Sequence, residues 1–255
     1  VVQDIRGHWA SDGKFHPLFN DDWTDAEDGY DTIEWAATQP WSNGKVGTFG
    51  YSYCSWTQWA MAPTRPPHLV TMFTGGMAPR TTDWEQGGVF RPGRALQWTL
   101  GSMAPDAQKF LSEPRGPTTV EEYEYLHENV NREKWLWFLP WKDLPEEAVG
   151  GLGERIHDWL SNHHVDRWHF DDNYQKIDLP IFHRTGWYDR LVRTVDMFKG
   201  MREYGATESS RQNQRLIVGP WTHTAELDRT LGEMDFGAGA EVDYFSLIIP
   251  WFDYW

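Results

Sequence analysis

The sequence has 255 residues, a formal net charge of −15 and a mean hydropathy of −0.66. This length accommodates one sizeable core, or a core with an inserted cap. The charge argues against nucleic acid and anionic membrane surfaces as partners, and no apolar run reaches the roughly 20 residues that span a bilayer. We therefore expect a soluble protein. The single cysteine excludes an internal disulfide framework but does not decide the compartment, although a cytoplasmic location is favoured over a secreted one.

The first 61 residues alternate between strand patterns and helix patterns. Residues 1–5 are predicted to form a buried strand, and residues 24–37 form a helix whose apolar side chains recur at helical spacing. A strand at 46–49 and a helix over 56–61 follow. Such alternation favours a parallel sheet with helices on its faces.

The middle of the chain has a different pattern. A strand at 68–73 is followed by helical segments with little strand character. We predict an α/β core in two parts, 1–82 and 177–255, with a helical cap over 83–176 between them. The main helices expected in the cap are 94–101, 119–131 and 146–160.

Strand and helix patterns return after the cap. We predict strands at 179–186 and 215–220, and helices at 192–204 and 244–255.

The stretch Gly50-Tyr51-Ser52-Tyr53-Cys54 lies between a strand and a helix. A serine on such a turn is typical of the nucleophile elbow of α/β-hydrolases, which needs a small residue two positions before the serine. The backbone amide of Tyr53 would then face a developing oxyanion. The usual pattern ends in glycine, where this chain has Cys54, so the motif alone is also compatible with an ordinary turn.

A serine nucleophile needs a base, and the base needs an acceptor that fixes its tautomer. In α/β-hydrolases these residues follow in the order Ser, Asp, His, each after a strand. Ser52, Asp189 and His223 have this order and these positions, and we predict them as a catalytic triad. The alternatives are a solvated acid and a surface histidine, since the chain has 38 acids and 10 histidines.

Several further motifs resemble one family, the X-prolyl dipeptidyl-peptidase and cocaine-esterase-like (CocE/NonD) hydrolases. The resemblance covers the chain except most of the predicted cap. The motifs are Asp4-x-Arg6-Gly7, Ala10-Ser11-Asp12-Gly13, Asp25-Ala26-Glu27-Asp28, Pro40-Trp41-Ser42-Asn43-Gly44-Lys45-Val46-Gly47, Gly50-x-Ser52-Tyr53, Gly186-Trp187-Tyr188-Asp189 and Gly219-Pro220-Trp221-x-His223.

The resemblance implies the α/β-hydrolase fold, the same triad and the Tyr53 amide as an oxyanion donor. It also implies that segments are missing at both ends: an N-terminal one with a second oxyanion donor, and a C-terminal jelly-roll domain. We therefore expect a chain truncated at both ends. Family members usually have glycine where this chain has Ser55, which together with the missing donor favours a non-catalytic or truncated version of the fold as an alternative.

The abundant aromatic residues suit a pocket for an apolar or aromatic acyl group. We assign Trp84, Phe90, Trp187 and Leu191 to this pocket. The amino-acid ester hydrolases of the family hold a substrate ammonium with acids just after the catalytic aspartate. Here the segment 190–193 is Arg-Leu-Val-Arg, so an apolar or anionic acyl group is favoured.

A second group of polar residues follows no strong zinc spacing, and we interpret it as a polar loop rather than a metal site. It consists of His163, His164, His169, Asp171 and Asp172.

The leading hypothesis is a serine hydrolase that cleaves small-molecule carboxylic esters or amides through an acyl-enzyme, without a cofactor or metal. X-prolyl dipeptidyl-peptidase and acyl transferase activities are the enzymatic alternatives. The sequence gives no indication of the oligomeric state.

Overall fold

The computed structural model describes residues 1–13, 24–80, 85–86, 89–98, 117–149, 169–224 and 227–255, with isolated residues between 106 and 161. The chain forms two compact units. The first contains Val1, Asp21–Arg80 and Trp168–Trp255, and the second contains Val2–Asn20 and Thr81–Arg167. This division differs from the predicted core and cap at 2–20, 81–82 and 168–176.

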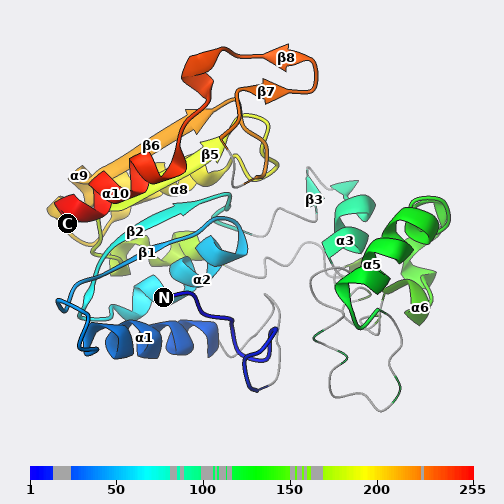
Figure 1. Cartoon of the computed structure of the whole chain (residues 1–255), viewed down its shortest axis with the longest axis horizontal. Helices are drawn as coiled ribbons and strands as arrows, with labels where there is room; N and C mark the ends of the chain where they lie inside the picture. The colour runs from blue at the N-terminus through cyan, green and yellow to red at the C-terminus, as the bar shows by residue number, and fades with distance from the viewer. Residues whose placement is uncertain are drawn as a thin grey trace. The chain divides into compact units, whose positions relative to one another are not determined.

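The first unit is built on a parallel four-stranded sheet with the order β1-β2-β5-β6 (Figure 1). The parallel sheet and its flanking helices confirm the predicted α/β class. The strands are β1 (Val46–Phe49), β2 (Leu69–Gly75), β5 (Ile181–Gly186) and β6 (Gln214–Gly219).

One face of the sheet packs against α1 (Thr24–Ala37), α2 (Tyr53–Met61) and α8 (Thr194–Tyr204). Side chains alternate along a strand, so every second residue of β5 points to this face. His183 is one of them, and its ring lies 5.9 Å from Trp59 of α2 and 5.6 Å from Phe198 of α8, between ring centroids.

The opposite face packs against α10 (Tyr244–Tyr254), drawn in red in Figure 1. The Trp251 indole donates a 2.7 Å hydrogen bond to the Thr71 hydroxyl of β2, and its ring contacts Phe182 of β5. Phe73 and Phe182 stack on the same face with ring centroids 4.6 Å apart. Helix α10 therefore holds β2 and β5 together from this side.

Shorter elements complete the first unit. They are η1 (Ala62–Thr64), η6 (Phe170–Lys176), α9 (Glu208–Gln212), the β7 (Thr230–Leu231) and β8 (Met234–Asp235) hairpin, and η7 (Ala238–Ala240).

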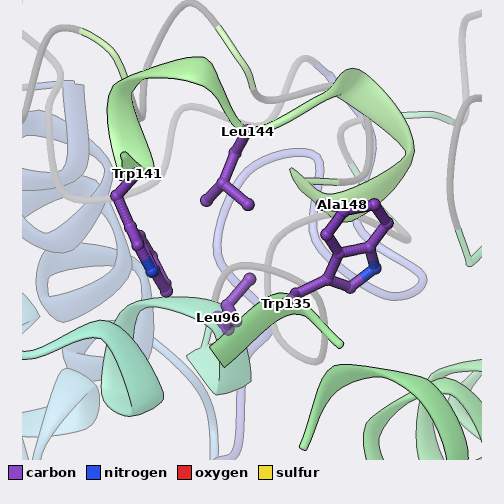
Figure 2. Packing of buried hydrophobic residues seen from close by; sticks show 5 residues of the cluster. All are labelled: Leu96, Trp135, Trp141, Leu144 and Ala148. Atoms are coloured by element: carbon purple, nitrogen blue, oxygen red, sulfur yellow. The ribbon is translucent and has the colours of Figure 1, made fainter. Parts of the chain in front are cut away.

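The second unit has short helices around its own apolar cluster (Figure 2). Leu96 comes from α3, and the other four members are Trp135, Trp141, Leu144 and Ala148. The elements are β3 (Glu85–Gln86), β4 (Val89–Phe90), α3 (Pro92–Trp98), α5 (Val120–Leu126), the π-helical η3 (His127–Asn131), η4 (Trp135–Trp137), η5 (Trp141–Asp143) and α6 (Glu146–Val149). Among the described helices of the whole chain, none has the length and apolar character that crossing a bilayer requires.

One prediction of secondary structure is wrong. Residues 1–5 form no strand, and Val1 and Val2 are 78% and 97% exposed. A short apolar run predicts burial only if a neighbouring strand pairs with it, and the run itself carries no information about such a partner. The segment predicted to have little strand character contains one short hairpin, β3–β4.

The turn from β1 into α2 has an unusual backbone. Ser52 has φ 59° and ψ −123°, a strained conformation for a residue with a side chain. Hydrogen bonds hold the turn to β2, from the Gly50 amide to the Phe73 carbonyl (3.1 Å) and from the Ser52 amide to the Gly75 carbonyl (2.9 Å). This is the sharp turn predicted for a nucleophile elbow.

The buried His183 makes the stability of the folded protein depend on pH. Its side chain hydrogen-bonds to the Gln214 side chain (2.9 Å), and burial lowers its pKa to about 4 although that bond acts in the opposite direction. In the unfolded chain the pKa of a histidine is about 6.5. Below that pH the unfolded state binds a proton that the folded state excludes, so the stabilisation is complete above about pH 6.5 and falls towards pH 4.

We expect this site to remove about 3 kcal/mol from the free energy of unfolding across that interval. Urea unfolding between pH 8 and pH 4 measures it, with His183→Gln as the comparison because glutamine keeps a donor but does not titrate. The variant should be less stable at pH 8 and show a flatter pH dependence. Equal slopes for the two proteins would contradict this assignment.

Gly50 should tolerate no side chain. A Cβ there would lie 2.5 Å from Cys54 Cβ and 2.9 Å from the Cys54 carbonyl oxygen. We expect Gly50→Ala to reduce the free energy of unfolding by about 1–3 kcal/mol, measured by urea or thermal unfolding. Gly239→Ala is the control, because nothing lies within 4 Å of a Cβ at that position. Adding Cys54→Gly to Gly50→Ala removes the shortest contact and should restore part of the stability.

Candidate active site

Three loops meet at the carboxyl edge of the sheet, one after each of β1, β5 and β6. Ser52 follows β1, Asp189 follows β5 and His223 follows β6. Parallel strands end at the same edge, so residues that are 171 positions apart in sequence come into contact.

The three side chains form a continuous hydrogen-bonded chain. His223 Nε2 lies 2.7 Å from Ser52 Oγ, and His223 Nδ1 lies 2.8 Å from Asp189 Oδ1. Because a carboxylate only accepts, Nδ1–H donates to Asp189 and Nε2 is left to accept the serine proton. This is the arrangement in which a histidine acts as a base toward a serine.

The loops that carry Asp189 and His223 are bound to each other through their backbones. The Trp187 amide donates to the Gly219 carbonyl (2.9 Å), and the Tyr188 amide donates to the Trp221 carbonyl (3.1 Å). A Cβ at Gly186 would collide with the Trp221 carbonyl. The glycine that ends β5 therefore permits the two loops to approach.

Asp189 is only 3% exposed, so its charge depends on hydrogen bonds. Burial raises the pKa of this carboxyl, but hydrogen bonds from His223, Tyr51 and the Leu191 amide outweigh burial and hold the pKa below its usual range. The Leu191 amide bond is 2.7 Å long. The environment therefore keeps Asp189 ionised as the partner of His223.

Tyr51 and Arg184 were not predicted as site residues. The Tyr51 hydroxyl donates to Asp189 Oδ2, and the Arg184 guanidinium lies 4.1 Å from the centroid of the Tyr51 ring. A charged residue inside the apolar strand pattern of 181–186 was the available signal for Arg184. No linear pattern indicates the direction in which the Tyr51 side chain points.

The predicted pocket residues have different surroundings. Leu191 is buried next to Asp189, whereas Trp187 is 65% exposed. Phe90 belongs to the second unit, where its ring contacts Trp141 (5.4 Å between centroids). Trp84 lies outside the described residues. Tyr53 is the first residue of α2, and the roles of its amide and of these pocket residues stay predictions.

Ser55 has a packing role. It is fully buried, and its Oγ accepts a 3.2 Å hydrogen bond from the Gly75 amide at the end of β2. The Ser55 side chain thus connects α2 to the sheet.

The polar group around residue 170 forms ion pairs. Arg80 binds Asp171 (2.7 Å) and Asp172 (3.3 Å), and His169 lies 3.8 Å from Asp172. Within the residues that the structure describes, no group of three or more potential metal ligands occurs. His163 and His164 lie outside the described residues.

One curated protein is similar in sequence to most of this chain. The chain is 28% identical over 251 residues to the cocaine esterase of Rhodococcus sp. (strain MB1 Bresler), an alignment that covers 94% of this chain and 41% of that protein. The chain therefore spans about two fifths of the length of this curated relative.

Solved structures show the same fold. An aminopeptidase from a marine sediment Thaumarchaeota archaeon superposes with a TM-score of 0.58 at 18% identity, covering 92% of this chain and 39% of that one. A CocE/NonD family hydrolase from Staphylococcus aureus superposes with a TM-score of 0.52 at 24% identity, covering 84% and 30%.

The family model described as X-Pro dipeptidyl-peptidase (S15 family) matches residues 1–225, which is most of the chain. This match and the α/β-hydrolase fold agree with the resemblance found in the sequence. The chain therefore belongs to the X-Pro dipeptidyl-peptidase S15 family of hydrolases.

Proposed function

We propose that this protein hydrolyses carboxylic esters or amides through an acyl-enzyme formed on Ser52. The observation that carries the proposal is the chain of contacts from Ser52 Oγ to His223 Nε2 (2.7 Å) and from His223 Nδ1 to Asp189 (2.8 Å). Family membership supports the same reaction class.

In the first half of the reaction, His223 Nε2 takes the Ser52 proton while Oγ attacks the substrate carbonyl carbon. The carbonyl electron pair moves to oxygen, and the Tyr53 amide at the N-terminus of α2 is the proposed donor to that oxyanion. The intermediate then expels the leaving group, which takes the proton from His223. The product is an ester between the acyl group and Ser52.

In the second half, water replaces the leaving group. His223 takes a proton from water as the water oxygen attacks the acyl carbon, and then returns that proton to Ser52 Oγ. Asp189 remains ionised throughout and stabilises the imidazolium that forms twice in each cycle. This mechanism needs no cofactor or metal.

We propose that the acyl group of the substrate is either apolar or anionic. The loop after Asp189 contributes Arg190 and Arg193 instead of acids, and Arg193 forms a 3.0 Å ion pair with Asp196. A substrate ammonium would face side chains of its own charge on this loop. Apolar and aromatic esters should therefore react better than amino-acid esters or Xaa-Pro amides.

Fluorophosphonate labelling followed by intact-mass measurement tests the nucleophile. Wild-type protein should gain one adduct and Ser52→Ala none, and hydrolysis of 4-nitrophenyl butyrate should fall by about 10⁴- to 10⁶-fold in the variant. The loss is expected because the variant lacks the oxygen that forms the acyl-enzyme.

Cys54→Ala is the matched control, because it removes an exposed nucleophile two residues from Ser52 and keeps the Cβ that faces Gly50. This variant should retain its label. A folded wild-type protein without a label, or a Ser52→Ala variant that keeps one, would overturn the proposal. Comparing 4-nitrophenyl benzoate with Ala-Pro-4-nitroanilide then separates esterase from dipeptidyl-peptidase activity.

A further inference from the structure

The side chain of Tyr51, which lies between Gly50 and Ser52 in the elbow, contacts the buried carboxylate of Asp189. The Tyr51 hydroxyl donates to Asp189 Oδ2, while Asp189 Oδ1 accepts from His223 and from the Leu191 amide. Each carboxylate oxygen therefore has its own donors. Without Tyr51, the described contacts would hold the carboxylate through Oδ1 alone, and rotation of the group about its Cβ–Cγ bond would be less restrained.

The Tyr51 ring is fixed on several sides. Gly75 and Gly76 lie against it, because a Cβ on either would come within 2.9 Å and 2.6 Å of ring carbons. The His223 ring lies 5.1 Å away between centroids. Two consecutive glycines at the end of β2 thus make room for a phenol beside the catalytic histidine.

A buried cation completes this enclosure. Arg184 is only 1% exposed, and its guanidinium lies 4.1 Å from the Tyr51 ring centroid and 5.1 Å from that of Tyr244. Its Nη2 donates to the carbonyl of Thr224, the residue after His223. Arg184 therefore connects the Tyr51 ring, by a cation–π contact, to the loop that carries the histidine.

The electrostatics keep Tyr51 a donor. Burial strongly raises the pKa of the Tyr51 hydroxyl, and the neighbouring Asp189 charge raises it further, against smaller opposing effects of Arg184 and Arg190. The phenol stays protonated at the pH values at which Asp189 is ionised. A hydrogen bond to an ionised acceptor is about twice as strong as one between neutral groups, so this contact restrains the carboxylate effectively.

From these contacts we propose that Tyr51 is a positioning residue, which fixes the Asp189 carboxylate so that its other oxygen orients His223 toward Ser52. This role deepens the proposed hydrolase function and rests on it. The elbow would then supply both the nucleophile and, from the preceding residue, the restraint on the triad's acid.

Tyr51→Phe tests the proposal because it keeps the ring against Arg184 and removes only the hydroxyl. Tyr244→Phe is the matched control, because it removes a hydroxyl that hydrogen-bonds to Arg184 and has no contact with Asp189 among the described interactions. Thermal unfolding establishes that both variants fold. The readouts are ester hydrolysis as a function of pH and the downfield proton resonance of His223 Nδ1–H, assigned by its loss in His223→Gln.

We expect Tyr51→Phe to lower kcat/KM by about 10- to 100-fold, mostly through kcat, because orientation of the base is impaired. Losing a donor to the ionised carboxylate also raises the pKa of Asp189. The pH dependence of the rate reports the ionisation of groups in the site, so its acidic limb should move to higher pH by about half a unit or more. The Nδ1–H resonance should shift and broaden, and Tyr244→Phe should change none of these.

A Tyr51→Phe protein whose rate, acidic limb and resonance match those of Tyr244→Phe would overturn the positioning role. The resonance does not depend on turnover, so it decides the question even if wild-type Ser52 takes up no fluorophosphonate and the proposed function fails. If Tyr51→Phe does not fold, the ¹³Cζ signal of Tyr51 in wild-type protein replaces it. That signal should show no ionisation up to about pH 11, and titration near pH 10 would contradict the proposal.

Discussion

The burial of one carboxylate, Asp189, is the constraint on which the arrangement of the site depends. An ionised group in a protein interior is tolerated only when hydrogen bonds replace the lost water. Here the donors come from the turn after β1, from the loop after β5 and from the loop after β6. Satisfying this charge therefore requires three segments, distant in sequence, to meet at one point.

The sheet makes that meeting possible. Its strands are parallel, so the three loops start from one edge, and the fixed register of β5 with β6 sets Gly186 beside Gly219. The absence of a side chain at Gly186 then lets the backbone of Trp221 approach closely. Helices on both faces secure the strands, with His183 packed on one side and Phe182 on the other. The site is thus a consequence of ordinary sheet packing together with a few missing side chains.

Much of this is predictable from sequence, because strand and helix periods and the order of elements are local properties. The strands around Ser52, Asp189 and His223 and the helices at 24–37 and 192–204 follow from such patterns and correspond to elements of the structure. The strand expected at 1–5 failed because strand formation depends on a partner elsewhere in the chain.

The contacts around Asp189 could not be predicted from the sequence, because they also depend on residues that are distant along the chain. Whether Tyr51 points to solvent or to the carboxylate depends on the strained φ of the next residue and on the space above Gly75 and Gly76. The burial of Arg184 likewise depends on the aromatic rings that the fold sets on either side of it. These are properties of three-dimensional packing, and a linear motif describes only the residues that take part.

Cys54, which replaces the usual second glycine of the elbow, has a practical consequence. It is the only cysteine in the sequence and is exposed, so a thiol-reactive fluorophore would attach at one position, two residues from Ser52. Partial burial of its sulfur nevertheless raises the pKa of the Cys54 thiol, and the thiolate is the reactive form, so efficient attachment calls for mildly alkaline buffer. The emission of such a dye would report solvent access beside the elbow. The cysteine at the position of the usual glycine thus provides a single attachment site for an optical probe.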